Sequence, residues 1–229
     1  MSRLPGGTDL TGAQFFGSDG QGLIAGLAVV VMAAGMGTRM RSKQAKVLHQ
    51  VAGRAMVLYS VGLGLRVAGD RVAVVVGHQA ELVREVIVRA TSGTSEHASV
   101  SIVEQRQQLG TGHAVLQSRP VFAEGRHAAP SHYLILNGDT PLLRDETVRE
   151  LVRVHEAEGA AVTILTAKLQ DASGYGRVVR APSDGQRVSR IVEERDANEM
   201  ERAIREINVG TYVVSGEFLF RTLEQLDPS

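Results

Sequence analysis

Apolar and polar positions alternate along the chain in blocks that have the lengths of strands and helices. Short apolar runs rich in β-branched residues, such as residues 27–33 and 132–137, are typical of buried strands. Between such runs, apolar residues recur with the three- and four-residue spacing of helices. Strands that alternate with helices predict βαβ units, and therefore an α/β fold with a mostly parallel, mixed sheet flanked by helices.

The expected elements follow from this pattern and from turn residues at their ends. A helix over 145–158 would place Val148, Leu151, Val152 and Val154 on one face, with acidic residues in its first turn. The segment 177–193 reads as a hairpin because Pro182-Ser183-Asp184-Gly185 has strong turn chemistry. Expected strands are 27–33, 71–77, 99–104, 132–137, 161–167, 177–180, 188–193 and 208–214, and expected helices are 54–68, 80–90, 112–118, 145–158 and 216–225.

Residues 1–26 differ from the rest of the chain. They hold seven glycines and scattered apolar residues without periodicity, so they bury too little to offset the entropy of ordering. We expect a flexible, glycine-rich N-terminal arm over 1–26, followed by one α/β domain over 27–229.

Composition narrows the classes of function. The 25 basic and 25 acidic side chains balance, so no general field attracts nucleic acid or a membrane surface, and any phosphate recognition is local. The apolar run 23–34 is too short to cross a bilayer, and it has no features of a signal peptide. The chain has no cysteine, which excludes disulfides and thiolate metal sites. We expect a cytoplasmic protein without nucleic-acid or membrane partners.

A glycine-rich loop follows the first expected strand. Ligands of open α/β sheets bind at the carboxyl ends of the strands, where Ala34, Gly35 and Gly37 would bring backbone N–H groups close to phosphate oxygens. Arg39 and Lys46 add two cations. A plain tight turn explains the glycines but not the cations. The dinucleotide fingerprint fails because Met40 occupies its third glycine position, and the Walker motif lacks its GK[ST].

The stretch AVVVMAAGMGTRMRSKQAKVLHQVAGRAM resembles the signature LAAGxGTRMxSxxPKVLxxxxGxxM of the sugar-1-phosphate nucleotidyltransferases. It is most similar to that of the bacterial N-acetylglucosamine-1-phosphate uridyltransferases, and the resemblance implies their Rossmann-like nucleotidyltransferase fold. One departure is that Ala45 stands where the family usually has proline. Because proline would stiffen the loop, we expect Ala45 to loosen Lys46.

A second block, QRQQLGTGHA, begins at Gln105. On its own, Gly110-Thr111-Gly112 reads as the start of a helix with Thr111 as its cap. The resemblance instead implies that Gln105, Gly110 and Thr111 lie against uracil, opposite backbone groups of Ala34 and Gly35. A glutamine amide suits uracil because it can both donate and accept hydrogen bonds.

A third block, LILNGDTPLL, ends an apolar strand. Asp139 would lie at the same sheet edge as the glycine loop, where a carboxylate can hold Mg²⁺ between phosphate groups, although a loop-capping role is equally open. The resemblance implies the magnesium role. Asn137 stands where the family often has tyrosine or serine. The resemblance implies that Asn137 and Gly138 lie where the sugar or ribose is contacted.

Three later residues complete the resemblance: Gly176, Glu193 and Asn208. Taken alone, they are a turn glycine, a surface carboxylate and an amide at the start of a strand. In the resembling family such positions form the sugar pocket. Glu193 and Asn208 would bind hydroxyl and acetamido groups, and Gly176 would leave room for the ring.

The resemblance implies that UTP and N-acetylglucosamine-1-phosphate give UDP-N-acetylglucosamine and pyrophosphate, a step in cell-wall precursor synthesis, with Arg39 and Lys46 as catalytic residues and Mg²⁺ as cofactor. Two alternatives to this function remain: a sugar-1-phosphate nucleotidyltransferase that uses another base or sugar, and a catalytically silent nucleotide-binding relative. The family's domain continues beyond the equivalent of residue 229, with a second magnesium ligand, and an acetyltransferase half follows through which a full-length parent would form a homo-oligomer. The seven histidines show no convincing metal-ligand spacing, so we expect them to be structural or solvated.

Overall fold

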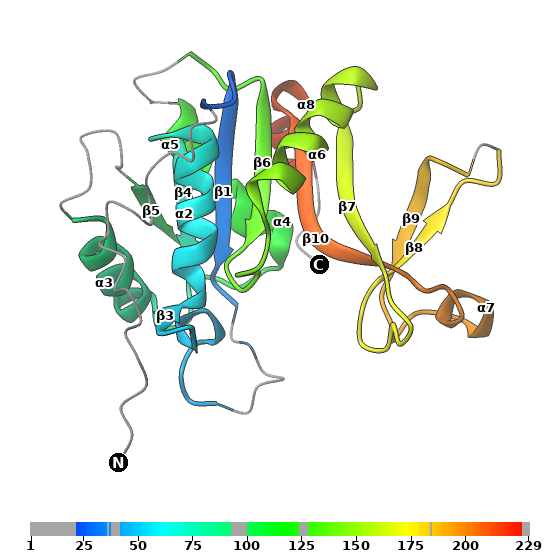
Figure 1. Cartoon of the computed structure of the whole chain (residues 1–229), viewed down its shortest axis with the longest axis horizontal. Coiled ribbons are helices and arrows are strands. Elements are labelled where there is room, and N and C mark those ends of the chain that lie inside the picture. Colours follow the sequence, from blue (N-terminus) through cyan, green and yellow to red (C-terminus); the bar gives the residue numbers. More distant parts are fainter. Residues whose placement is uncertain are drawn as a thin grey trace, which may run out of the picture.

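The computed structural model describes residues 22–35, 37, 42–92, 100–123, 128–183 and 185–225. Within these ranges one mixed sheet forms the centre of the molecule, with helices on both faces (Figure 1). Its strands are β1 (Leu27–Ala33), β4 (Val72–Val76), β5 (Val100–Glu104), β6 (His132–Asn137), β7 (Val162–Lys168), β8 (Arg177–Arg180), β9 (Val188–Val192) and β10 (Glu206–Ser215). The remaining elements are 3-10 helix η2 (Lys46–Leu48), strands β2 (Gln50–Val51) and β3 (Arg54–Ala55), and helices α2 (Met56–Ala68), α3 (Ala80–Thr91), α4 (Thr111–Leu116), α5 (Arg119–Ala123), α6 (Asp145–Ala157), α7 (Glu199–Arg202) and α8 (Gly216–Leu223).

The sheet has the strand order β5-β4-β1-β6-β10-β8-β9, and β7 also pairs with β10. Strands β5, β4, β1 and β6 are parallel, whereas β10 runs antiparallel to β6, β7 and β8. The carboxyl ends of the four parallel strands therefore meet at one edge of the sheet. This edge is where loops from distant parts of the sequence can build a common site.

The alternation of side chains along β1 divides the core into two layers. Leu27, Val29 and Val31 pack with residues of α2, α3 and α6 on one face of the sheet. Ala28 and Val30 pack on the other face with residues of α4, α5 and α8. All five side chains are fully buried, so the strand that carries the glycine loop is held rigidly from both sides.

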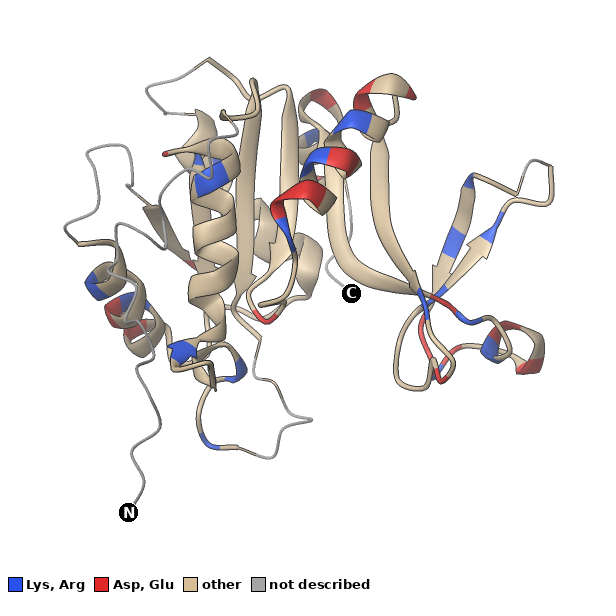
Figure 2. Ribbon diagram, in the orientation of Figure 1, with Lys and Arg blue, Asp and Glu red and all other residues tan. Residues whose placement is uncertain are grey.

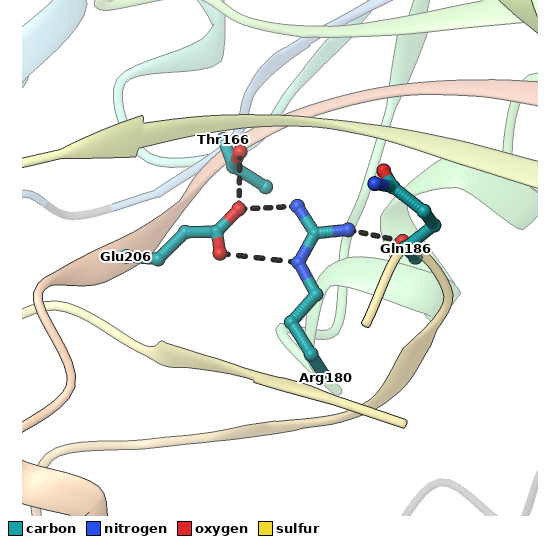
Figure 3. A network of polar contacts seen from close by, with 4 residues as sticks. All are labelled: Thr166, Arg180, Gln186 and Glu206. Carbon is teal, nitrogen blue, oxygen red and sulfur yellow. Dashed lines mark hydrogen bonds and ion pairs between the residues drawn. The ribbon is translucent and has the colours of Figure 1, made fainter. Parts of the chain in front are cut away.

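Strands β8 and β9 with α7, here called the hairpin unit, project from one side of the sheet (Figure 1). Backbone pairing between β8 and β10 is confined to Arg177 and Ile207. A polar network makes a second connection: the Arg180 guanidinium of β8 binds the Glu206 carboxylate of β10 and the carbonyl of Gln186. Thr166 of β7 donates to the same carboxylate at 2.7 Å (Figure 3). The network joins three strands and fixes the hairpin unit to the sheet.

Most sequence-based elements are confirmed, including the strands 27–33 and 132–137 at their predicted ends and the antiparallel β8–β9 hairpin. The predicted helix 54–68 was wrong at its start, because Arg54–Ala55 pairs with Gln50–Val51 around a turn with positive φ at Ala52 and Gly53. The cap role suggested for Thr111 was also wrong, since Gly110 is the N-cap and Thr111 is the first helical residue of α4.

The buried face of α6 differs from the expected one at its last position. Val148, Leu151 and Val152 are buried as predicted, but His155 replaces Val154 as the next core residue. His155 lies seven residues after Val148, which continues the face better than Val154 does. Burial lowers the pKa of His155, and its Nδ1 lies 2.9 Å from the Thr163 hydroxyl. His155 is therefore a core residue that binds β7.

Charged side chains lie along α6 and on the hairpin unit, whereas β1 has none (Figure 2). In the part of the chain that the structure describes, every helix is too short or too polar to cross a membrane.

Candidate active site

Loops at the carboxyl ends of β1, β5 and β6 surround a cavity of about 470 Å³. Nine of the predicted site residues line it, and they come from segments that are far apart in the sequence. The lining residues are Met32, Ala34, Gly35, Gly37, Lys46, Val47, Gln105, Gln108, Gly110, Thr111, Ala114, Asn137 and Asp139. The structure thus brings the glycine loop, the second block and the third block together.

Gly37 and Gly138 allow close approaches in this cavity. Gly37 has φ +63°, and a Cβ added there would lie 2.5 Å from Cβ of Lys46. A Cβ at Gly138 would lie 3.0 Å from the Met32 carbonyl oxygen and 3.1 Å from Cγ1 of Val47. Both positions therefore require glycine for the loops to pack against each other. Arg39, the other predicted cation, lies outside the described residues.

Lys46 and Asp139 form an ion pair on the wall of the cavity. Nζ of Lys46 lies 2.5 Å from Oδ2 of Asp139, and their side chains are 40% and 24% exposed. Lys46 begins η2, whose next two residues, Val47 and Leu48, are buried in the core. These apolar anchors hold the backbone, while the charged end of Lys46 reaches into the cavity.

The structure shows contacts at Ala45 that oppose the expected loosening of Lys46. Ala45 is fully buried, and its N–H donates to Oε1 of Gln79 at 2.7 Å. Nε2 of Gln79 donates to the Lys43 carbonyl at 2.8 Å. A proline at position 45 could not make the first of these bonds because it has no N–H. The segment before Lys46 is thus held by a side chain from the loop after β4.

The QRQQLGTGHA block forms another part of the cavity wall. Gln105 is 5% exposed, and its Nε2 lies 3.0 Å from both the Gly110 carbonyl oxygen and Nδ1 of His113. Gln108 was not predicted as a site residue, although it lies within the block. Its Nε2 donates to the Ala34 carbonyl at 3.0 Å, which links this wall to the loop after β1. The contact joins segments 74 residues apart, so local sequence gives no sign of it.

The amino-acid residues predicted to bind the sugar form a second cluster beside the cavity. A Cβ at Gly176 would lie 3.2 Å from Oε1 of Glu193, and the Asn208 N–H donates to the Gly176 carbonyl at 2.9 Å. Oδ1 of Asn208 accepts from the Gly210 N–H at 3.0 Å. Gly176 is buried and Glu193 is exposed, so the carboxylate is open to a ligand.

Asn137 connects this cluster to the cavity. Its Nδ2 donates to the Val209 carbonyl at 3.3 Å, and a Cβ at Gly210 would collide with the same amide nitrogen. Gly210 has φ +80° and lies within the irregularity where β10 pairs with β7. The backbone of Asn137 is fixed as well, since its carbonyl accepts from Ser60 at 2.8 Å and from Thr140 at 2.9 Å. The two predicted groups of residues are therefore continuous through β10.

Arg177 supports the second cluster and was not predicted. Its side chain is 3% exposed, and Nη2 lies 2.6 Å from Oε2 of Glu194, next to Glu193. The guanidinium also donates to the Tyr175 carbonyl, and the Gly174 N–H donates to Glu194 at 3.3 Å. The hydrogen bond from Arg177 lowers the pKa of the Glu194 carboxyl. Only the YGR sequence could have drawn attention to this arginine, and that sequence does not reveal burial.

The residues present suit magnesium held jointly by protein and substrate. Among the described residues, there is no group of three or more His, Asp or Glu that could hold a metal ion unaided. Mg²⁺ commonly takes one or two carboxylates and completes its shell with phosphate oxygens and water. Asp139, on the wall of the cavity that also holds the glycine loop, is a suitable carboxylate for such a shared site.

Comparison with known proteins connects this geometry to a family. The sequence model of the family described as nucleotidyl transferase matches residues 28–228. The chain is 48% identical over 197 residues to the bifunctional protein GlmU of Exiguobacterium sibiricum, covering 86% of this chain and 40% of the relative. The GlmU proteins of Anaeromyxobacter sp. and Geobacter sulfurreducens are 46% and 43% identical over 200 residues, covering 87% of this chain and 39% of each relative. The chain thus spans about 40% of the length of these relatives.

Solved structures with low sequence identity share the fold. Apo UDP-glucose pyrophosphorylase superposes with a TM-score of 0.64 at 16% identity, covering 89% of this chain and 81% of that chain. The complex of UDP-glucose pyrophosphorylase with UDP-glucose gives a TM-score of 0.65 at 16% identity, covering 88% and 80%. This likeness, with the observed sheet order, confirms the predicted Rossmann-like fold.

Proposed function

Because the chain belongs to the nucleotidyl transferase family, we propose that its cavity joins UTP to N-acetylglucosamine-1-phosphate, giving UDP-N-acetylglucosamine and pyrophosphate. One observation carries the proposal: glycine-loop residues, Lys46, Gln105, Gly110, Thr111 and Asp139 line one cavity. A cavity with backbone donors, a cation and a carboxylate suits a triphosphate and its counter-ion.

The reaction is a direct displacement at phosphorus. A phosphate oxygen of the sugar-1-phosphate forms a bond to the α-phosphorus of UTP while the bond from that phosphorus to the β-phosphate bridging oxygen breaks. Pyrophosphate leaves with the electron pair. Both reactants are anionic, so the protein acts mainly by alignment and by neutralising charge, without a covalent intermediate.

Lys46 and the glycine loop would bind the triphosphate. Backbone N–H groups at Gly35 and Gly37 can approach phosphate oxygens because glycine leaves room for them. The Lys46 ammonium would leave Asp139 and bind the phosphate oxygens that carry the developing charge. Arg39, on the same loop in the sequence, is proposed as the second catalytic cation.

Gln105, Gly110 and Thr111 would bind uracil, opposite the backbone of Ala34 and Gly35. Since Nε2 of Gln105 is engaged by Gly110 and His113, Oε1 is the atom of this amide that can accept from the N–H of uracil. Gln108 keeps the two walls together through Ala34.

Glu193, Asn208 and Gly176 would bind the sugar, with Asn137 and Gly138 between them and the nucleotide. The exposed Glu193 carboxylate can accept from sugar hydroxyl groups. The Asn208 side chain, fixed by Tyr212 at 2.6 Å and by Gly210, is suited to an acetamido group or a hydroxyl.

Asp139 would hold Mg²⁺ together with phosphate oxygens of UTP. When bound, the ion supplies positive charge that offsets the charge on the phosphates. Pairing with Lys46 keeps the Asp139 carboxylate at the cavity wall until substrate arrives. We further propose a cytoplasmic enzyme with UTP and the sugar phosphate as partners, and a full-length parent that assembles through a further domain.

The test is magnesium-dependent release of pyrophosphate from UTP and N-acetylglucosamine-1-phosphate. The assay should compare this chain with one extended by the segment that follows in the relatives, and both with Asp139→Asn. Panels of other nucleoside triphosphates and sugar-1-phosphates would show whether base and sugar are as proposed. UTP binding without pyrophosphate release, even by the extended chain, would instead indicate a non-catalytic nucleotide-binding protein.

A further inference from the structure

Gln79 has an unusual backbone conformation beside the cavity. Its φ is 55° and its ψ is 40°, and among the described residues only Ala52 shares positive φ without being glycine. The left-handed conformation costs free energy for a residue with a side chain, so it persists where the surroundings enforce it. Gln79 contacts Ala45, the residue before Lys46, so its conformation bears on the candidate site.

The position of Gln79 is enforced from β1. A Cβ at Gly77 would lie 2.9 Å from the Ala34 carbonyl oxygen, and the His78 N–H donates to the same oxygen at 3.1 Å. The loop after β4 therefore rests on the end of β1, next to the glycine loop. From this fixed base the chain enters α3 immediately after Gln79.

The side chain of Gln79 uses both ends of its amide on one segment. Oε1 accepts from the Ala45 N–H at 2.7 Å, and Nε2 donates to the Lys43 carbonyl at 2.8 Å. An amide can replace a backbone peptide in this way because it offers one donor and one acceptor in a plane. Lys43 and Ala45 are thus held at two points by a residue 34 positions away from Ala45.

The residue after this two-point contact is Lys46. Ala45 is fully buried with φ −54°, within the range that proline would impose, although alanine itself does not impose it. The contact with Gln79 supplies the missing restraint. It fixes the backbone from which Lys46 extends to Asp139.

We propose that Gln79 is a positioning residue for Lys46 and takes the place of the proline that the resembling signature has at position 45. This inference rests on the proposed function in one respect only, which is that UTP is the ligand of Lys46. Gln79 itself touches no substrate. Its role is to keep Lys46 in the arrangement that binds the triphosphate, so that this order need not be created on binding.

The main variant is Gln79→Gly, which removes the amide and tolerates the left-handed backbone, so the fold is not penalised by strain. Gln79→Asn is a second variant that tolerates the same backbone with a shorter amide. Ala45→Pro in the Gln79→Gly chain tests rescue, because proline restores the φ restraint without needing an N–H partner. Ala52→Gly is the matched control, since it changes the other left-handed residue, which lies in the β2–β3 turn and outside the contact with Gln79.

Two measurements separate this inference from the proposed function. Amide hydrogen exchange at Ala45 reports the contact without any ligand, and titration calorimetry with magnesium-UTP reports its consequence. We expect Gln79→Gly to speed Ala45 exchange by about tenfold or more and to weaken UTP binding by about tenfold, as when one residue must be ordered on binding. Adding Ala45→Pro should return UTP affinity to within about threefold of the parent, and Ala52→Gly should leave it unchanged.

Unchanged UTP affinity in Gln79→Gly, or failure of Ala45→Pro to restore it, would overturn the inference even if the parent binds UTP and releases pyrophosphate. If the Ala45 amide exchanges as slowly in Gln79→Gly as in the parent, the contact between Gln79 and Ala45 does not hold this segment. A parent that does not bind UTP would refute the proposed function, while the exchange data would still decide whether Gln79 holds the segment.

Discussion

The Nζ atom of Lys46 lies 2.5 Å from Oδ2 of Asp139, which joins the segment after β1 to the loop after β6 at the wall of the cavity. Both side chains remain partly exposed, so a ligand can reach them. An incoming triphosphate would compete with Asp139 for Lys46, and a cation would compete with Lys46 for Asp139. The pair is thus formed by the two groups that substrate binding has to separate.

Removing either charge should affect turnover more than folding. We predict that Lys46→Met and Asp139→Asn each lower kcat by about 10²- to 10³-fold in a chain that is active, because charge stabilisation at the reacting phosphates is lost. The melting temperature should stay close to that of the parent, since exposed ion pairs contribute little. Lys43→Met is the control, because only the backbone of Lys43 binds Gln79. Parent-like turnover in Lys46→Met would exclude its catalytic role.

Gly210 should be intolerant of a side chain. Gly210→Ala places a Cβ at φ +80° against the Asn137 amide, so we predict a loss of about 2–4 kcal/mol in unfolding free energy from strain and contact together. Gly53 has the same φ of +80°, but a Cβ added there meets no other atom within 4 Å. Gly53→Ala should therefore lose only the part of the unfolding free energy that comes from backbone strain. Denaturant unfolding measures both.

The contact part can be isolated by a second substitution. Asn137→Ala in the Gly210→Ala chain removes the amide that the new methyl group meets, so the double variant should be more stable than additivity predicts. If the two substitutions are additive, Asn137 and Gly210 do not interact as the structure indicates.

The parts of the fold that depend on local pattern were predictable from the sequence. Strands β1 and β6 begin and end as predicted because each is a continuous apolar run bounded by turn residues. The convergence of the glycine loop with Asp139 was also predictable, because the carboxyl ends of parallel strands meet at one edge, whereas the place of Gln105 was expected from the family resemblance. Their chemical roles remain predictions.

Features that depend on long-range contacts were not predictable. The β2–β3 hairpin has only two residues in each strand, which is too short for a periodic pattern. The effect of Ala45 was judged from the loop alone, whereas the restraint comes from Gln79. The core position of His155 and the burial of Arg177 likewise depend on neighbours that the local sequence does not reveal.

The attachment of the hairpin unit should weaken in acid through Glu206. Hydrogen bonding from Arg180, and then from Thr166, holds the pKa of Glu206 below its usual value. A lowered folded-state pKa adds stability above the unfolded-state pKa of about 4.3, and this contribution disappears as the pH falls through the folded-state value. We predict that Glu206→Gln loses about 1–3 kcal/mol of unfolding free energy at pH 7. The gap from the parent should shrink as the pH falls below about 4.

Urea unfolding of parent and variant between pH 7 and pH 3 measures this difference. Glu150→Gln is the control, because Glu150 also binds an arginine, Arg153, but on the exposed surface of α6. Its effect should be small at every pH. A constant gap between Glu206→Gln and the parent across this range would show that the Glu206 charge does not hold the hairpin unit.

The buried Arg177 should influence sugar binding through Glu194. Glu194→Gln keeps an oxygen for Arg177 and Gly174 but removes the charge that compensates a guanidinium with 3% exposure. The turn that holds Gly176 would then be free to move away from Glu193. The ratio of the Kd values for UDP and UDP-N-acetylglucosamine measures how much the sugar contributes to affinity. We predict that this ratio falls by about 3- to 10-fold in the variant, which then has lost most of the sugar's contribution. The Kd for UDP itself should be unaffected. Asp196→Asn alters a neighbouring but exposed ion pair with Arg195 and should leave the ratio unchanged. If Glu194→Gln weakens UDP and UDP-N-acetylglucosamine equally, the pair between Arg177 and Glu194 stabilises the fold without shaping the sugar side of the site.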